Sequence, residues 1–75
     1  MHTIWEAKLD GLYECQVIRT GDGTGRLRMT EISSGRELLS EDVILSVGAI
    51  FGPDVDDVAN WQDMCLKALD KIVNE

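Results

Sequence analysis

Residues 48–73 read GAIFGPDVDDVANWQDMCLKALDKIV, and the change of pattern inside this stretch decides the fold. Gly52-Pro53 ends one segment. Asp54 then stands where a helix N-cap is expected, with Asp57 three residues later as a carboxylate version of the capping box. The apolar residues that follow recur at helical spacing: Val58, Trp61, Cys65, Ala68, Leu69 and Ile72. The stretch therefore predicts one amphipathic helix of about five turns over residues 54–73.

Upstream of the helix, β-branched and alternating residues lie between turn signals at Asp10-Gly11, at Gly21–Gly25 and at Ser33-Ser34-Gly35. This pattern predicts strands at about residues 3–9, 12–19, 26–32 and 37–47. The sequence therefore predicts one α+β domain. It is a four-stranded antiparallel β-meander followed by a C-terminal amphipathic α-helix packed on one sheet face.

The first hairpin can be joined by a loop of two or of three residues. A two-residue Asp10-Gly11 loop mixes apolar and polar groups on both faces of the hairpin. A loop of Leu9, Asp10 and Gly11, with Gly11 in the left-handed region, is preferred because it leaves one apolar face. That register sets Glu6 near Glu14 on the other face. The apolar face would carry Trp5, Ala7, Tyr13, Cys15 and Val17.

The later strands alternate as well. In the third, Leu27 and Met29 point inward, while Arg26, Arg28 and Thr30 point outward. The apolar face of the fourth comprises Leu39, Val43, Leu45 and Val47. Ser40-Glu41-Asp42 interrupts this strand and predicts a bulge or bend. In the connection that follows, Ile50 and Phe51 either plug the end of the core or form an exposed binding knob, and the first interpretation is favoured.

The chain of 75 residues is long enough for one small domain and too short for a large enclosed pocket. Charged residues interrupt the N-terminal segment, so neither a signal-peptide core nor a membrane span is predicted, and we expect a cytoplasmic protein. Cys15 and Cys65 are expected to be reduced, buried thiols. The alternative is a disulfide that joins the first hairpin to the final helix.

No catalytic residue, metal site or cofactor is predicted. The single histidine, His2, lies at the chain terminus, so a Ser-His or Cys-His pair is not expected. Zinc needs three or four ligands, which two distant cysteines and this histidine do not supply. Asp54, Asp56 and Asp57 lack the spacing of a calcium loop and suit the first turn of a helix instead. We therefore expect a protein that is not an enzyme.

The segment Gly21–Gly25, with Arg26 and Arg28, supports an alternative function, a small-ligand or nucleotide-binding module. Its glycines would allow backbone N–H groups to approach an anion, and the arginines could supply positive charge. The known phosphate-binding motifs open onto a helix, whereas this segment opens onto a strand. A plain hairpin tip is therefore the favoured interpretation.

The net charge of −7 is unevenly distributed. Residues 1–40 contain five basic and six acidic residues, whereas residues 41–75 contain two basic and eight acidic ones. We therefore expect an acidic helical half and a basic middle hairpin. Sequence-blind nucleic-acid binding needs clustered cations, so no direct nucleic-acid partner is expected. The basic residues of the hairpin are Arg19, Arg26, Arg28 and Arg36.

Aliphatic residues also fall on the predicted sheet face opposite the helix, which should be polar if water covers it. They are Ile4, Leu12, Ile18, Ile32, Leu38 and Ile44. Either the sheet curls over them or a second chain covers them. A homodimer through sheet faces or edges would enlarge the buried area of so small a domain. The predicted oligomer face is Ile4, Leu12, Ile18 and Ile44.

Together these features favour a small, acidic, cytoplasmic protein-interaction domain that modulates or inhibits a partner protein with a basic surface. Antitoxins, immunity proteins and phage-encoded host or defence modulators are commonly short, acidic, single-domain chains, a similarity of general type. Phe51 is a predicted aromatic anchor, and Trp61 is another if it is exposed, although its helical spacing favours burial. The predicted partner-binding residues are Asp54, Asp56, Asp57 and Asp63.

Overall fold

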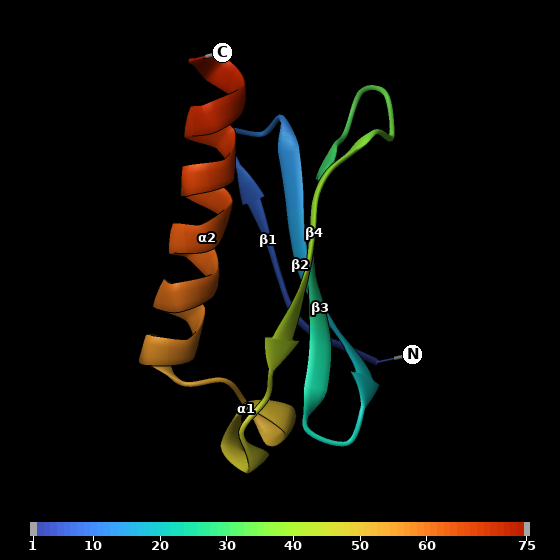
Figure 1. Ribbon diagram of the computed structural model, residues 1–75, viewed down its shortest axis with the longest axis vertical. Helices are drawn as coiled ribbons and strands as arrows, with labels where there is room; N and C mark the ends of the chain where they lie inside the picture. The colour runs from blue at the N-terminus through green and yellow to red at the C-terminus, as the bar shows by residue number, and fades with distance from the viewer. Residues whose placement is uncertain (1, 75) are drawn as a thin grey trace.

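A computed structural model describes residues 2–74 and shows an antiparallel sheet with strand order β1-β2-β3-β4 followed by two helices. The elements are β1 (His2–Leu9), β2 (Tyr13–Gly21), β3 (Thr24–Glu31), β4 (Glu37–Ile44), α1 (Val47–Phe51) and α2 (Val55–Val73). The long helix α2 runs along one face of the sheet, and α1 lies at the end where β4 finishes (Figure 1). The predicted α+β meander with its C-terminal helix is confirmed, and α1 is an additional element.

The start of α2 is set by the predicted carboxylates. The Asp54 side chain accepts a hydrogen bond from the backbone N–H of Asp57 at 2.8 Å, and the Asp57 side chain accepts one from the backbone N–H of Asp54 at 3.2 Å. Such reciprocal bonds satisfy two backbone donors that a helix start otherwise leaves unpaired. The helix then continues to Val73, in agreement with the predicted range.

The core lies between α2 and one face of the sheet. Trp61 and Cys65 of α2 are buried against the strands, and the rings of Trp5 and Trp61 lie 5.8 Å apart in a tilted arrangement. This separation is typical of a favourable aromatic pair. The predicted inward residues of β2 and β3 are confirmed. The fully buried core comprises Cys15, Val17, Leu27, Met29, Leu45, Ala49, Trp61 and Cys65.

The first hairpin has the predicted apolar face but a different register. Leu9 lies opposite Tyr13, so the loop consists of Asp10, Gly11 and Leu12 instead of the predicted three residues beginning at Leu9. Gly11 has the expected positive φ of 69°, and Asp10 also has a positive φ of 53°.

The shift of register also changes the charges on the outer face of this hairpin. Glu6 lies opposite Gln16, and Lys8 lies opposite Glu14. The predicted contact between Glu6 and Glu14 is therefore wrong, and an attractive pair of opposite charges takes its place.

The fourth strand is shorter than predicted and bulges elsewhere. β4 ends at Ile44, and Val47 belongs to α1, where it is exposed instead of sharing a buried face with Leu45. The irregularity lies at Leu38, because Met29 pairs with Leu39 whereas Thr30 pairs with Glu37. Through residues 40–42 the ladder with β3 is regular.

Side-chain bonds explain why the predicted bulge at Ser40-Glu41-Asp42 is wrong. Arg26 binds the Ser40 hydroxyl at 2.8 Å and the Asp42 carboxylate at 2.9 Å from the neighbouring strand. These contacts fit strands in regular register across this segment.

The sheet face opposite α2 carries mainly polar side chains, and two of the six predicted aliphatic residues pack against the core instead. Ile4 sits at a register shift between Thr3 and Trp5 and packs against the core, and Leu38 does so at the bulge. Leu12 lies in the first hairpin loop, Ile32 follows the end of β3, and Ile44 ends β4. Of this set only Ile18 occupies the middle of the outer face, in the row of Arg26 and Asp42.

Candidate interaction surface

The two cysteines form a buried thiol pair. Both are free and fully buried, Cys15 on β2 and Cys65 on α2. Burial raises the pKa of Cys15, and burial together with the neighbouring Cys15 thiol raises the pKa of Cys65 to about 12. Both thiols therefore stay protonated at neutral pH, which makes them weak nucleophiles and weak metal ligands.

Residues 2–74 contain neither a cluster of metal ligands nor a helix suited to span a membrane. Among residues 2–74, no three His, Cys, Asp or Glu side chains gather closely enough to hold a metal ion. Neither helix in this range combines the length and the apolar character needed to cross a membrane.

The glycine segment forms a tight hairpin whose arginines already have partners. Arg26 binds Asp42 at 2.9 Å, Arg28 binds Glu37 at 2.8 Å, and both pairs lie on the outer face of the sheet. Arg19 binds Asp22 at 3.1 Å. Three of the four cations of the expected basic hairpin are thus neutralised within the chain, which weakens the case for a phosphate site.

The glycines of this hairpin have conformational and packing roles. Gly23 has a positive φ of 73° in the two-residue turn, a conformation that glycine adopts without strain. Gly25 is buried, and a Cβ atom added there would lie 3.0 Å from the Ile18 carbonyl oxygen. Close packing therefore accounts for glycine at position 25.

The short helix α1 divides its residues between core and solvent. The Ser46 hydroxyl accepts a hydrogen bond from the backbone N–H of Ala49 at 3.1 Å and caps the start of the helix. At the other end, the Gly52 N–H donates to the Gly48 carbonyl at 2.9 Å. Ala49 is buried and Ile50 packs against the core, so the predicted plug at the end of the core is confirmed for Ile50 and is wrong for Phe51, which is exposed.

The opposite side of α1 presents large apolar side chains to water. Val47 and Phe51, four residues apart and hence on one helix face, are 74% and 88% exposed. Val55 at the start of α2 is 83% exposed, and Ile44 at the end of β4 is 92% exposed. These elements meet at one end of the molecule (Figure 1). We call Ile44, Val47, Phe51 and Val55 the end patch.

The predicted acidic residues differ in their distance from the end patch and in their bonds. Asp54 and Asp57 cap α2 beside the patch, and Asp56 lies exposed between them with no ion pair among residues 2–74. Asp63 lies about 13 Å further along the helix axis than Asp54. It pairs with Lys67 at 2.9 Å, and this hydrogen bond raises the pKa of Lys67. The structure therefore groups the first three carboxylates with Phe51 and sets Asp63 apart.

The two predicted aromatic anchors have opposite environments. Trp61 is only 3% exposed and belongs to the core, whereas Phe51 projects into solvent. Val47 and Val55 were not among the predicted binding residues. Two signals in the sequence could have revealed α1: Ser46 as a helix start and Gly52-Pro53 as a helix stop. Comparison of the chain with protein-family models, with curated proteins and with solved structures found no match.

Proposed function

We propose that this protein is a small acidic protein-binding domain, a modulator or inhibitor without enzymatic activity that occupies a basic surface of its partner. The observation that carries the proposal is the exposure of Phe51 on a capped helix that also exposes Val47, with exposed Val55 at the start of the next helix. An aromatic side chain within an exposed apolar patch is typical of the residues that dominate binding energy.

Folding does not account for the end patch. Ala49 and Ile50 already attach α1 to the core, so the exposed side chains of Val47 and Phe51 contribute little to its packing. Burial of one phenylalanine side chain in a partner's pocket would stabilise a complex by about 1.5 to 3 kcal/mol before the costs of ordering.

The surrounding charge favours a basic partner. Asp54 and Asp56 border the patch, and eight of the fourteen acidic residues lie in residues 41–75. A partner with cations around an apolar cleft would be attracted over a distance comparable to the Debye length, about 8 Å at physiological salt. The same carboxylates would repel an anionic membrane, which disfavours a lipid surface as the target of the patch.

Affinity capture with matched variants tests the proposal. Tagged wild-type chain should retain a basic protein from lysate at low salt, and Phe51→Ala should lose most of it. Leu66→Ala is the control, because Leu66 is an exposed aliphatic residue of α2 about 16 Å along the axis from Val55. Retention that is equal for wild type and Phe51→Ala would refute the role of the end patch.

A further inference from the structure

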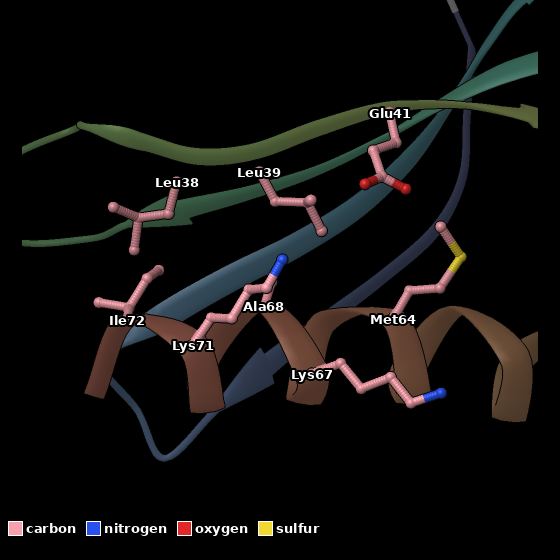
Figure 2. A pocket seen from close by; sticks show the side chains of 8 residues that line it. All are labelled: Leu38, Leu39, Glu41, Met64, Lys67, Ala68, Lys71 and Ile72. Atoms are coloured by element: carbon pink, nitrogen blue, oxygen red, sulfur yellow. The ribbon is translucent and has the colours of Figure 1, made fainter. Parts of the chain in front are cut away.

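A groove separates the edge strand β4 from α2. It has a volume of about 480 Å³. In Figure 2 the side chains of Leu38 and Leu39 both point from β4 toward Ala68 and Ile72 of the helix. Consecutive strand residues normally point to opposite faces, and the bulge at Leu38 is what turns both leucines toward the groove. The full lining comprises Leu38, Leu39, Glu41, Met64, Lys67, Ala68, Lys71 and Ile72.

The groove borders a free sheet edge. β4 is the last strand in the order β1-β2-β3-β4, so one side of its backbone has no neighbouring strand within the sheet. Such an edge can pair with another extended strand. Side chains of an added strand that point toward α2 would enter the groove.

Two charged groove residues form no ion pair among residues 2–74. Glu41 lies opposite the buried Leu27, on the face that α2 covers, and Lys71 faces the groove from the helix. The other acids of β4, Glu37 and Asp42, bind arginines on the outer face. Within residues 2–74, neither Glu41 nor Lys71 has an oppositely charged partner within 4.0 Å.

We propose that two copies of the chain pair through β4, antiparallel about a two-fold axis at Ser40, to form one continuous sheet. In this arrangement Glu41 of each copy lies beside Leu39 of the other. Figure 2 places Leu39 nearer the Lys71 end of the groove and Glu41 nearer the Met64 end. Each Glu41 therefore reaches the region of Lys71 in the second copy. Because of the two-fold symmetry, the dimer contains two such Glu41–Lys71 ion pairs.

The charges of β4 favour this register over those with the axis at Glu41 or Asp42. An axis at Glu41 would set the two Glu41 side chains directly opposite each other, and an axis at Asp42 would do the same for Asp42. An axis at Ser40 places serine opposite serine and no like charges in the neighbouring pairs. It also keeps both α2 helices on the same face of the sheet, so the leucines of each groove remain on the covered side.

The other edge of the sheet fits the groove less well. The β1 residues that face α2 are apolar, namely Trp5, Ala7 and Leu9, and offer no cation to Glu41. Pairing of β4 with β1 of a further copy would also be head-to-tail and leave an open edge at each end. A second copy joined through β4 closes the interface and satisfies both free charges.

This dimer goes beyond the proposed function and does not depend on it. Because the two β4 strands run in opposite directions, the end patches would lie at opposite ends of the dimer and stay free for a partner. Loss of the dimer and loss of partner binding are therefore separable. Phe51→Ala should leave the mass in solution unchanged.

Charge reversal tests the pairing. Analytical ultracentrifugation of the wild type should give twice the chain mass of 8.3 kDa. Glu41→Lys alone and Lys71→Glu alone should each raise the dimer dissociation constant about tenfold or more, because both ion pairs become repulsive. An equimolar mixture of the two variants should dimerise again, because each contact in the mixed pair joins opposite charges.

A control separates this interface from general charge effects. Glu6→Lys makes the same charge change at an exposed position of β1 and should leave the dimer intact, while circular dichroism checks that every variant folds. A monomeric wild type at millimolar concentration would overturn the proposal. Dimers of Glu41→Lys as strong as those of the wild type, or a mixture that stays monomeric, would overturn it equally.

Discussion

Substitution of Gly25 by alanine tests whether the glycine segment is there for packing. Gly25 is buried in β3, opposite Arg19 of β2 and Val43 of β4. An added Cβ atom would lie 3.0 Å from the Ile18 carbonyl oxygen and 3.0 Å from Leu45 Cδ1. Real Cβ contacts of this length are rare, so the strand or Leu45 must move.

The expected effect on stability follows from two opposing contributions. Overpacking of a closely packed core costs about 1 to 3 kcal/mol. Alanine in place of glycine at a compatible backbone conformation stabilises by about 0.4 to 1 kcal/mol, because the unfolded chain has less entropy to lose. We therefore expect Gly25→Ala to lower the free energy of unfolding by about 0.5 to 2 kcal/mol and Tm by several degrees.

Urea denaturation followed by tryptophan fluorescence measures this change in stability. Two further variants test whether the close contacts of the added Cβ atom cause it. Gly21→Ala is the control, because its added Cβ would meet only the rotatable Thr24 hydroxyl at 3.0 Å. Leu45→Ala removes one of the two close contacts, so the cost of Gly25→Ala should be smaller in that background. A Gly25→Ala protein as stable as the wild type would refute the packing explanation and restore the glycine segment as a candidate ligand loop.

Three further changes test the cap, the thiols and the end patch. Asp54→Ala should lower the free energy of unfolding by about 1 kcal/mol in urea titrations, because it removes the N-cap of α2. The control Asp56→Ala, at a position without a capping bond, should change this free energy by less than about 0.5 kcal/mol. Since the folded-state pKa of Cys65 is raised from 9.0 to about 12, the folded protein holds this proton more tightly, so stability should fall as pH rises through that window. Cys65→Ala should flatten this fall in thermal unfolding curves, and an equally steep fall in the variant would exclude the thiol as its cause. Phe51→Ala should leave the midpoint of urea unfolding within about 0.5 kcal/mol of the wild type, and a larger loss would show that the exposed ring supports the fold.

Side-chain periodicity predicted the faces of the sheet but not the pairing of the first hairpin. A loop of Leu9–Gly11 and a loop of Asp10–Leu12 differ by a shift of two residues between the strands. Because the pleat repeats every two residues, both registers place Trp5, Cys15 and Val17 on the same face. The hydrophobic pattern thus determines the face and leaves the register to the loop, where both Asp10 and Gly11 adopt positive φ.

The features missed in the sequence have different causes. The bulge at Leu38 turns two adjacent leucines to the same side, and the Leu38-Leu39 pair alone does not show whether a strand bulges there. Helix start and stop signals flank α1 in the sequence, but five residues are too few to show the helical spacing of apolar residues. The capping roles of Asp54 and Asp57 were predicted correctly, whereas the ion pair of Asp63 with Lys67, four residues later on the same helix, was not predicted.

The structure also changes how the charge of the molecule should be understood. Three of the four cations of the middle hairpin each bind a carboxylate, namely Arg19, Arg26 and Arg28, so the basic pole expected from the sequence is largely neutralised. Of the carboxylates at the start of α2, those of Asp54 and Asp57 cap the helix without a cation, and Asp56 has no ion pair among residues 2–74. A partner approaching this end meets uncompensated negative charge around an exposed phenylalanine. Salt should therefore weaken capture mainly by slowing association, whereas Phe51→Ala should act by speeding dissociation, since rim charges steer encounter and buried anchors hold the complex.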